Sequence, residues 1–270
     1  MSESDRIVFI GAGNMTEALV KGLRAAGVPG SRLCVTDVRP ERLAWFREQF
    51  DVAGASDNAA ASAGADVIVL AVKPQQFGEV VPSLRGASSR ALFVSIAAGI
   101  PTARIEDSLG GAARVVRVMP NTPALVGAGV SALCAGARAE EADLAKAERI
   151  LQAVGRTVRV PESLMDAVTA VSGSGPAYVF RVMEAMEAAA IRQGLPADVA
   201  RTLVVETVAG AGRLARESGR APADLRAQVT SKGGTTEAAL RVLEARDLGG
   251  AFDAAIEAAA ARARELASGR

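Results

Sequence analysis

The sequence predicts an α/β protein whose N-terminal half is a mostly parallel sheet covered by helices and whose C-terminal half is entirely helical. Up to about residue 160, short apolar runs alternate with helical stretches, as in strands joined by helical crossovers. From about Pro161 the strand pattern stops and long alanine-rich segments follow. We therefore expect two domains, residues 1–160 and residues 161–270, which agrees with roughly 100–200 residues per domain.

Individual elements follow from apolar spacing. In chain order, the predicted strands are RIVFIG from Arg6, RLCVTD from Arg32, DVIVLAV from Asp66, ALFVSIA from Ala91 and ARVVRVMP from Ala113. In the second half, apolar side chains recur every three or four residues, as on one face of a helix. They include Val199, Leu203, Val204 and Val208.

The composition excludes several classes of partner. The 31 basic and 30 acidic residues are interspersed and leave a net charge of +1, so no basic face indicates nucleic-acid binding. Seven Phe, one Tyr and one Trp leave few rings for base stacking. No apolar run approaches the roughly 18 residues of a membrane span. The start, MSESDRIVFIGAG, lacks the basic region of a signal peptide, and we expect a cytoplasmic protein.

The cysteines and the missing histidines limit the chemistry. Cys34 and Cys134 each lie in a predicted strand, which favours buried free thiols over a disulfide, and two cysteines cannot form a cysteine-rich zinc site. The absence of histidine excludes histidine acid–base catalysis and histidine-ligated metals. We predict no metal, and we expect chemistry from hydroxyls, backbone amides, carboxylates, lysine or a cofactor.

A glycine turn near the N-terminus indicates a dinucleotide. In IVFIGAGNMTEALVKGL, a strand leads into a helix through Gly11, which permits a tight turn, and Gly13, which lets the backbone approach a pyrophosphate. The helix that begins near Asn14 supplies unpaired N–H groups and a positive dipole end. Thr16 stands where the third small residue of the motif is expected. The surrounding strand–helix–strand pattern predicts a Rossmann-type domain.

The preferred cofactor stays open at this stage. Asp37 ends the second predicted strand, where a carboxylate accepts hydrogen bonds from the adenosine ribose and favours NAD(H). Arg39 is close enough to turn toward the 2′-phosphate of NADP(H). Lys73 and Pro74 follow a strand at the sheet edge that binds ligands in open α/β folds. Solvated residues at a turn or a strand end are the alternative interpretation of Asp37 and Lys73.

Six motifs occur in a fixed order along nearly the whole chain, between residues 6 and 244. They are FIGAGNMTEALVKGL, AVKPQ, VMPNTPA, AVTAVSGSGPAYVF, GLP and VTSKGGTTEAAL. In this order they resemble the pyrroline-5-carboxylate reductase family, the last enzyme of proline synthesis. The most specific of them are SGSGPAYVF and the segment from Val229. The resemblance implies reduction of 1-pyrroline-5-carboxylate to L-proline with NADPH or NADH, and a C-terminal helical domain that interlocks with a partner subunit. It implies a homo-oligomer with a dimer as minimum unit and allows a decamer.

The resemblance also implies roles for particular residues. The pyrophosphate would lie against Gly11, Gly13, Asn14 and Met15, the adenosine side against Asn58, Ala71, Val72, Lys73 and Pro74, and the nicotinamide toward Ala98 and Asn121. The substrate loop would consist of Ser231, Gly233, Gly234, Thr235 and Thr236. Lys232 stands where many members have proline, and Thr16 where they have Gly or Ala. These departures make the loop less rigid, add a cation near it, and set the first helix slightly farther from the first strand.

The substrate loop suits a small carboxylate. Glycines before a helix N-terminus expose N–H donors, and the helix dipole attracts the anion. Ser231 adds a hydroxyl, and Thr236 can donate a hydrogen bond to the ring nitrogen of the imine. Because solvent can protonate an imine before hydride attack, we expect Thr236 to orient and polarise the substrate rather than to act as an obligatory acid. By spacing alone, helix capping from Gly234 to Glu237 is the simpler interpretation; the resemblance favours the substrate loop.

Two other functions compete with an imine reductase. A reductase of 3-hydroxy acids would need a lysine on the long helix after the domain junction, and AVTAVSGSGPAYVF has none. A nucleotide-binding sensor without catalysis would keep the glycine turn but would have no need of the hydroxyls in SKGGTT. We therefore predict an enzyme, and a turnover assay separates it from the sensor.

Overall fold

The computed structural model describes residues 5–87 and 90–267, which form two compact units. One unit contains the chain up to Ser174 together with the segment from Ala259 on, and the other is Gly175–Ala258. The predicted domain boundary at residue 160 is a different division of the chain and stays a prediction.

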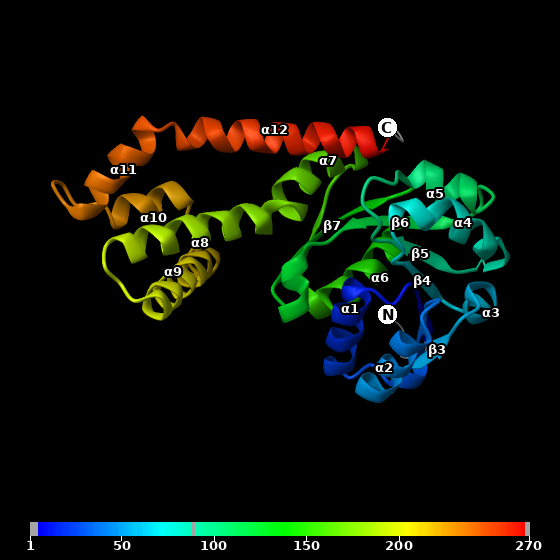
Figure 1. Ribbon diagram of the computed structural model, residues 1–270. Coiled ribbons are helices and arrows are strands. Elements are labelled where there is room, and N and C mark those ends of the chain that lie inside the picture. The colour runs from blue at the N-terminus through cyan, green and yellow to red at the C-terminus, as the bar shows by residue number, and fades with distance from the viewer. Residues whose placement is uncertain (1–4, 88–89, 268–270) are drawn as a thin grey trace. The chain divides into compact units, whose positions relative to one another are not determined.

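Among the described residues, eight strands form one sheet in the order β3-β2-β1-β4-β5-β6-β7-β8 (Figure 1). They are β1 Ile7–Ile10, β2 Leu33–Thr36, β3 Ala53–Ala55, β4 Val67–Leu70, β5 Leu92–Ser95, β6 Arg114–Met119, β7 Gly129–Ala135 and β8 Gly155–Arg159. The first six run parallel, whereas β7 is antiparallel to β6 and β8 is parallel to β7. The mostly parallel sheet that the sequence predicts is confirmed. The chain adds β2 and β3 on one side of β1 and then continues with β4 on the other side.

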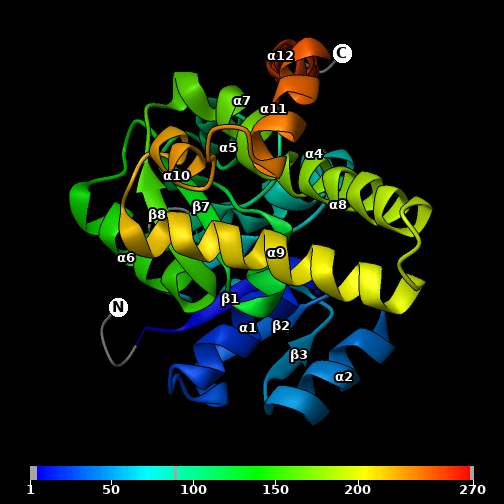
Figure 2. The same cartoon turned by 90° about the vertical axis from the view of Figure 1, so that its left-hand side faces the viewer.

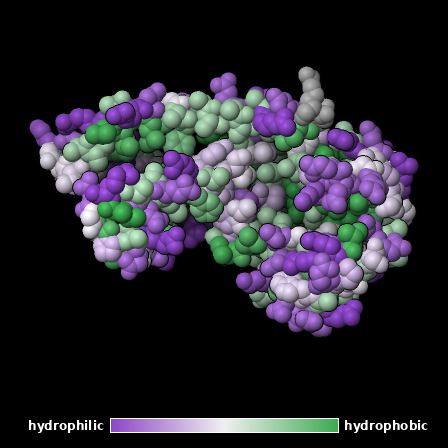
Figure 3. All heavy atoms as spheres, in the orientation of Figure 1, coloured by the Kyte–Doolittle hydropathy of each residue, from purple (hydrophilic) through white to green (hydrophobic). Residues whose placement is uncertain are grey.

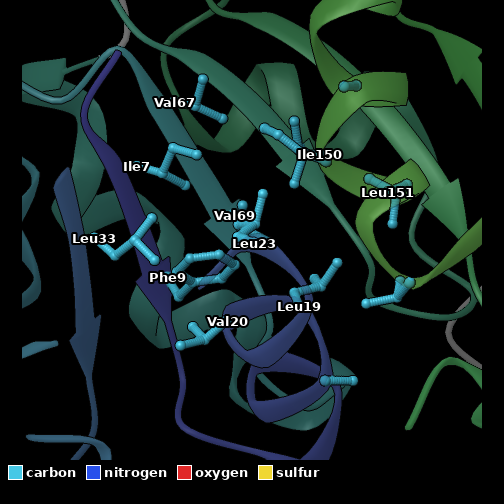
Figure 4. Packing of buried hydrophobic residues seen from close by; sticks show 14 of the residues in the cluster. Ile7, Phe9, Leu19, Val20, Leu23, Leu33, Val67, Val69, Ile150 and Leu151 are labelled. Carbon is cyan, nitrogen blue, oxygen red and sulfur yellow. The ribbon is translucent and has the colours of Figure 1, made fainter. Parts of the chain in front are cut away.

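Helices cover both faces of this sheet. The helices of the first unit that precede residue 160 are α1 Asn14–Ala25, α2 Pro40–Phe50, α3 Asn58–Ser62, α4 Phe77–Val80, α5 Thr102–Ser108 and α6 Glu141–Leu151. On one face, Ile7 and Phe9 of β1 and Val69 of β4 pack against Leu19 of α1 and Ile150 of α6 (Figure 4). All of these side chains are fully buried.

The alternate residues of the same strands build the opposite core. Ile10 of β1, Ile68 of β4 and Phe93 of β5 pack with Phe77 of α4 and Ile105 of α5. Both faces of each central strand are therefore buried, which explains why these strands appear in the sequence as continuous apolar runs.

The two cysteines are buried in this sheet without a disulfide, as predicted. Burial raises the pKa of the Cys134 thiol to about 11, so the thiol stays protonated near neutral pH. Cys134 packs with Ala132 and with Met165, the first residue of α7 Met165–Val168. A π-helical segment, Thr169–Gly173, follows α7 and leads to the helical unit.

The second unit is all helical, as predicted. Its helices are α8 Gly175–Arg192, α9 Ala197–Ser218, α10 Pro222–Gln228, α11 Thr235–Ala245 and the start of α12 Leu248–Ala267. Helices α8 and α9 pack side by side (Figure 2). Within the described part of this unit, only Ala200 and Val204 are buried, and hydrophobic residues lie on its surface (Figure 3).

Candidate cofactor pocket and substrate loop

The glycine turn after β1 brings the backbone close to the neighbouring strand. Gly11 has φ +107°, and a Cβ at this position would lie 2.8 Å from the carbonyl oxygen of Ala71. Its N–H donates to the carbonyl oxygen of Thr36 at 2.9 Å, so the turn is tied to β2. Only glycine fits both the positive φ and the close approach.

Helix α1 begins directly after this turn with no side-chain cap. Gly13 is the N-cap residue, and its extended backbone directs the chain into the helix. The amide groups at the start of α1 are therefore open to a ligand, and the helix dipole favours a negative one. Asn14 is exposed and Met15 half-buried at this end. This cradle fits a pyrophosphate.

Thr16 is accommodated inside the turn. The side chain is fully buried, and its hydroxyl donates a hydrogen bond of 2.6 Å to the carbonyl oxygen of Gly11. The departure from the small residue of the motif therefore adds a bond that holds the glycine turn against α1.

A pocket of about 150 Å³ opens at the carboxyl ends of β1, β2 and β4. Of the residues predicted to bind the cofactor, it brings together Gly11, Gly13, Asp37, Asn58, Ala71, Val72 and Lys73. Sequence reasoning gave no role to further lining residues, which are Ile10, Ala12, Thr36, Val38, Ser56, Gln76 and Val80. Ser56 directly follows β3 and Val38 lies two residues after β2, positions that the strand-end rule could have identified. Gln76 and Val80 lie on the segment after β4, which no motif marked.

Asp37 and Arg39 form an ion pair at the edge of this pocket. Nε and Nη2 of Arg39 donate to the two carboxylate oxygens of Asp37 at 2.9 and 3.0 Å. The hydrogen bonds from Arg39 lower the pKa of the Asp37 carboxyl to about 2, against the opposing effect of burial. The carboxylate therefore stays ionised throughout the physiological pH range.

Asn58 is fixed from the neighbouring strand. The hydroxyl of Thr36, at the end of β2, donates to Oδ1 of Asn58 at 2.6 Å. Asp57 caps α3 by accepting from the N–H groups of Ala59 and Ala60. Asn58 is thus held at the pocket wall by its backbone and by its side chain.

The remaining predicted cofactor residues lie outside this pocket lining. Pro74 begins a 3₁₀ turn after Lys73, and Ala98 is exposed in the loop after β5. Asn121 fastens the connection between β6 and β7, because Oδ1 accepts from the N–H of Val130 at 3.0 Å and Nδ2 donates to the hydroxyl of Ser172 at 3.4 Å. Their roles toward the nicotinamide stay predictions.

The predicted substrate loop lies in the helical unit and leads into α11. Gly234 is the N-cap of α11, and its N–H donates to the carbonyl oxygen of Ser231 at 3.0 Å. Gly233 has φ +72°, and its N–H donates to Oε2 of Glu237 at 2.7 Å. Two backbone donors of the loop, the N–H groups of Gly233 and Gly234, are therefore bonded within the chain, and the carboxylate of Glu237 supports the helix start, in agreement with the capping interpretation.

The hydroxyls of the loop are not bonded in the same way. Within the described residues, the side chains of Ser231, Thr235 and Thr236 make no hydrogen bond. Ser231 and Thr235 are exposed, and Thr236 is half-buried in the first turn of α11. Capping accounts for Glu237 and Gly233 but leaves these hydroxyls available to a ligand.

Within residues 5–87 and 90–267, none of the helices combines the length and the apolar composition that a membrane span requires. No cluster of three Cys, Asp or Glu side chains that could hold a metal ion occurs there.

The glycine turn, the strand-end pocket and the helical C-terminal region define a dinucleotide-dependent oxidoreductase with a separate helical region. Residues 162–266 match the family model described as pyrroline-5-carboxylate reductase dimerisation, and residues 6–99 match that of NADP oxidoreductase, coenzyme F420-dependent. A pyrroline-5-carboxylate reductase of Pseudomonas aeruginosa is 46% identical, covering 97% of each chain, and one of Methanosarcina acetivorans is 42% identical over 98% of each. The chain belongs to the pyrroline-5-carboxylate reductase family.

Solved structures agree with this assignment. The pyrroline-5-carboxylate reductase of Coxiella burnetii has a TM-score of 0.94 and 43% identity, covering 97% of this chain and 98% of that one. The Plasmodium falciparum pyrroline carboxylate reductase, solved with NADP bound, has a TM-score of 0.87 and 28% identity, covering 98% and 99%.

Proposed function

We propose that the protein reduces 1-pyrroline-5-carboxylate to L-proline with a reduced nicotinamide dinucleotide, the final step of proline synthesis. The observation that carries the proposal is the full-length relationship to enzymes named for this reaction, at 46% identity over 97% of each chain for the Pseudomonas relative. The nucleotide pocket and the substrate loop supply the two binding functions that such a reaction needs.

The dinucleotide would lie along the pocket at the carboxyl edge of the sheet. Gly11, Gly13, Asn14 and Met15 would hold the pyrophosphate, because the glycine turn offers backbone contact and α1 offers unpaired amides. The adenosine side would rest on Asn58, Ala71, Val72, Lys73 and Pro74, and the nicotinamide would reach Ala98 and Asn121. When bound, the dinucleotide supplies the hydride.

The substrate carboxylate would bind at the loop before α11, where Ser231 and the glycines lie next to a helix N-terminus. The hydroxyl of Thr236 would donate to the ring nitrogen and orient the C=N bond toward the hydride. The product is an amine, so the nitrogen ends with a proton, and an imine takes that proton from solvent before hydride transfer. The chain's task is therefore orientation, which can supply on the order of 7–11 kcal/mol of the barrier.

We further infer the working arrangement of the chain. Residues 1–160 would act as the nucleotide-binding domain and residues 161–270 as the substrate and dimerisation domain. The match of residues 162–266 to a dimerisation model supports a homodimer as the minimum unit, from which a decamer can be built. The protein would act in the cytoplasm.

The experiment that tests the reaction follows the loss of the reduced-nicotinamide absorbance after pyrroline-5-carboxylate is added, with NADH and NADPH in parallel. Rapid substrate-dependent oxidation is the expected result. A folded protein that binds nucleotide but oxidises neither cofactor would contradict the proposal and favour a sensor or a different imine substrate.

A further inference from the structure

The Asp37 carboxylate has no acceptor position left for a ligand. Oδ1 accepts from the backbone N–H of Arg39 at 3.0 Å and from its Nε at 2.9 Å. Oδ2 accepts from the backbone N–H of Ala12 at 2.9 Å and from Nη2 of Arg39 at 3.0 Å. A carboxylate offers about four lone-pair positions, and these four donors fill them. The Asp37 side chain is also only 9% exposed.

Asp37 therefore acts within the chain. Its bond to Ala12 ties it to the glycine turn, and its paired bonds to Arg39 hold a guanidinium group in one orientation. A ribose hydroxyl could reach Asp37 only after displacing Arg39. The position of Asp37 at the end of β2 indicates a residue that accepts hydrogen bonds from the ribose. The structure favours a different role.

Arg39 keeps one edge of its guanidinium group free. The edge formed by Nε and Nη2 faces Asp37, whereas Nη1 makes no hydrogen bond with any described residue. The side chain is 52% exposed and lines the pocket beside Ser56 and Lys73. The edge formed by Nη1 and Nη2 has the planar, two-donor geometry that binds a phosphate.

We propose that Asp37 is a positioning residue, that it aims the free edge of Arg39 at the 2′-phosphate of NADPH, and that the protein therefore binds NADPH more tightly than NADH. The pairing with Arg39 also neutralises the carboxylate, so the repulsion that normally excludes a 2′-phosphate is reduced. The inference rests on the proposed function, since it deepens the choice of cofactor for that reaction.

The first experiment measures binding without turnover. Titration calorimetry with 2′,5′-ADP and with 5′-AMP isolates the 2′-phosphate, and nicotinamide fluorescence gives the Kd of NADPH and of NADH. Arg39→Met keeps the length of the stem and removes the donors. We expect it to weaken NADPH and 2′,5′-ADP on the order of tenfold or more and to change NADH about twofold at most.

A matched variant controls for charge. Arg47→Met removes an arginine from α2, the helix that begins directly after Arg39, but Arg47 does not line the pocket. Its expected effect on every ligand is within about twofold, the size of a screened surface charge. Equal weakening of NADH and NADPH by Arg39→Met would overturn the inference, because a general attraction to the dinucleotide, without a 2′-phosphate contact, produces that result.

The second experiment tests the positioning role of Asp37. If Asp37 acts through Arg39, Asp37→Asn weakens NADPH and leaves NADH nearly unchanged, and adding it to Arg39→Met weakens NADPH no further. If Asp37 is instead a ribose acceptor, Asp37→Asn weakens NADH and tightens NADPH. Thermal unfolding of each variant shows whether the hydrogen bond between Asp37 and Ala12 contributes to stability. Arg39→Lys keeps the charge but loses the planar pair of donors, so it should bind NADPH more tightly than Arg39→Met and less tightly than the wild type.

These outcomes separate the inference from the reaction. A protein that binds 2′,5′-ADP through Arg39 but oxidises neither nicotinamide refutes the proposed reaction alone. A protein that reduces pyrroline-5-carboxylate but binds NADH more tightly refutes the inference alone.

Discussion

Glu162 joins three elements of the sheet unit through one carboxylate. It accepts from the backbone N–H and the hydroxyl of Thr102, the first residue of α5, at 2.8 and 2.6 Å. It also pairs at 3.1 Å with Arg117 of β6, whose side chain is 7% exposed. Burial alone would raise the pKa of the Glu162 carboxyl, but the hydrogen bonds from Thr102 and Arg117 outweigh it and the pKa is lowered.

This network predicts a pH-dependent stability. Glu162→Gln should lower the free energy of unfolding at pH 7 by about 1–3 kcal/mol, because Arg117 is left buried without its partner charge. Since the folded-state pKa is lowered, the contribution is present above the usual value of 4.5 and is lost as the pH falls through the folded pKa. Urea unfolding at pH 7 and near pH 3 checks both points.

An exposed ion pair provides the control. Glu217→Gln removes a carboxylate from an exposed ion pair with Arg213 and should change stability by about 0.5 kcal/mol at most. A Glu162→Gln protein that is as stable as the wild type at pH 7, or whose deficit persists unchanged at acid pH, would show that the network is not a source of stability.

The hydroxyl of Thr236 is the group expected to orient the substrate. Thr236→Val keeps the shape of the side chain and removes a hydroxyl that makes no bond within the described residues. It should lower kcat by roughly tenfold, the loss of one hydrogen bond worth about 1.4 kcal/mol, with less effect on the Kd of the dinucleotide. Steady-state kinetics with a separate binding titration measures both. Thr202→Val, in α9, is the control, and wild-type turnover by Thr236→Val would remove the assigned role.

Among the elements, α1 depends on a close approach at Gly22. A Cβ there would overlap the carbonyl oxygen of Ala153 and lie 2.8 Å from Cγ1 of Val154, both in the 3₁₀ turn after α6. The glycine therefore lets α1 pack directly against the backbone of this 3₁₀ turn.

Gly22→Ala should therefore destabilise the protein although alanine is the better helix former. Helix propensity would favour alanine by about 1 kcal/mol, but overpacking against a backbone costs about 1–3 kcal/mol or more. Gly78→Ala in α4, where a Cβ meets nothing within 4 Å, should be neutral or slightly stabilising. Thermal unfolding compares the two, and a Gly22→Ala protein as stable as Gly78→Ala would contradict the packing argument.

The elements also show which strands a sequence can reveal. The predicted strands are β1, β2, β4, β5 and β6, together with the strand around Cys134, which is β7, and each of them is mostly apolar and mostly buried. β3 consists of Ala53, Gly54 and Ala55, which carry no β propensity, and β8 is a largely exposed strand with two arginines. These two strands form because the sheet offers them an unpaired edge, which no local pattern encodes.

The helical unit cannot bury its own apolar surface. In its described residues only Ala200 and Val204 are buried, while Phe180 is 56% exposed, Leu203 52% and Val242 60%. Surface of this kind in a folded protein marks an interface. Together with the dimerisation match, it explains why the alanine-rich helices exist without a core of their own.

We expect at least a dimer by light scattering at micromolar concentration, and a midpoint of unfolding that rises with protein concentration. Leu203→Asp should raise the dissociation constant on the order of tenfold or more, because an unpaired carboxylate would be buried at the interface. Val38→Asp, an exposed apolar residue of the sheet unit, serves as control and should leave the assembly unchanged. A wild-type monomer would contradict the expectation.

The amino-acid sequence is enough to place the buried strands, the helices and the glycine turn, because apolar periodicity and glycine positions reflect local backbone geometry. The family follows from the motifs themselves. How the predicted residues are used depends on the three-dimensional arrangement. It filled the acceptor positions of Asp37 with Arg39, bonded the amide of Gly233 to Glu237, and gave the hydroxyl of Thr16 a partner in Gly11. Each of these depends on where a side chain meets its hydrogen-bond partner in space, and residue identity alone does not state that distance.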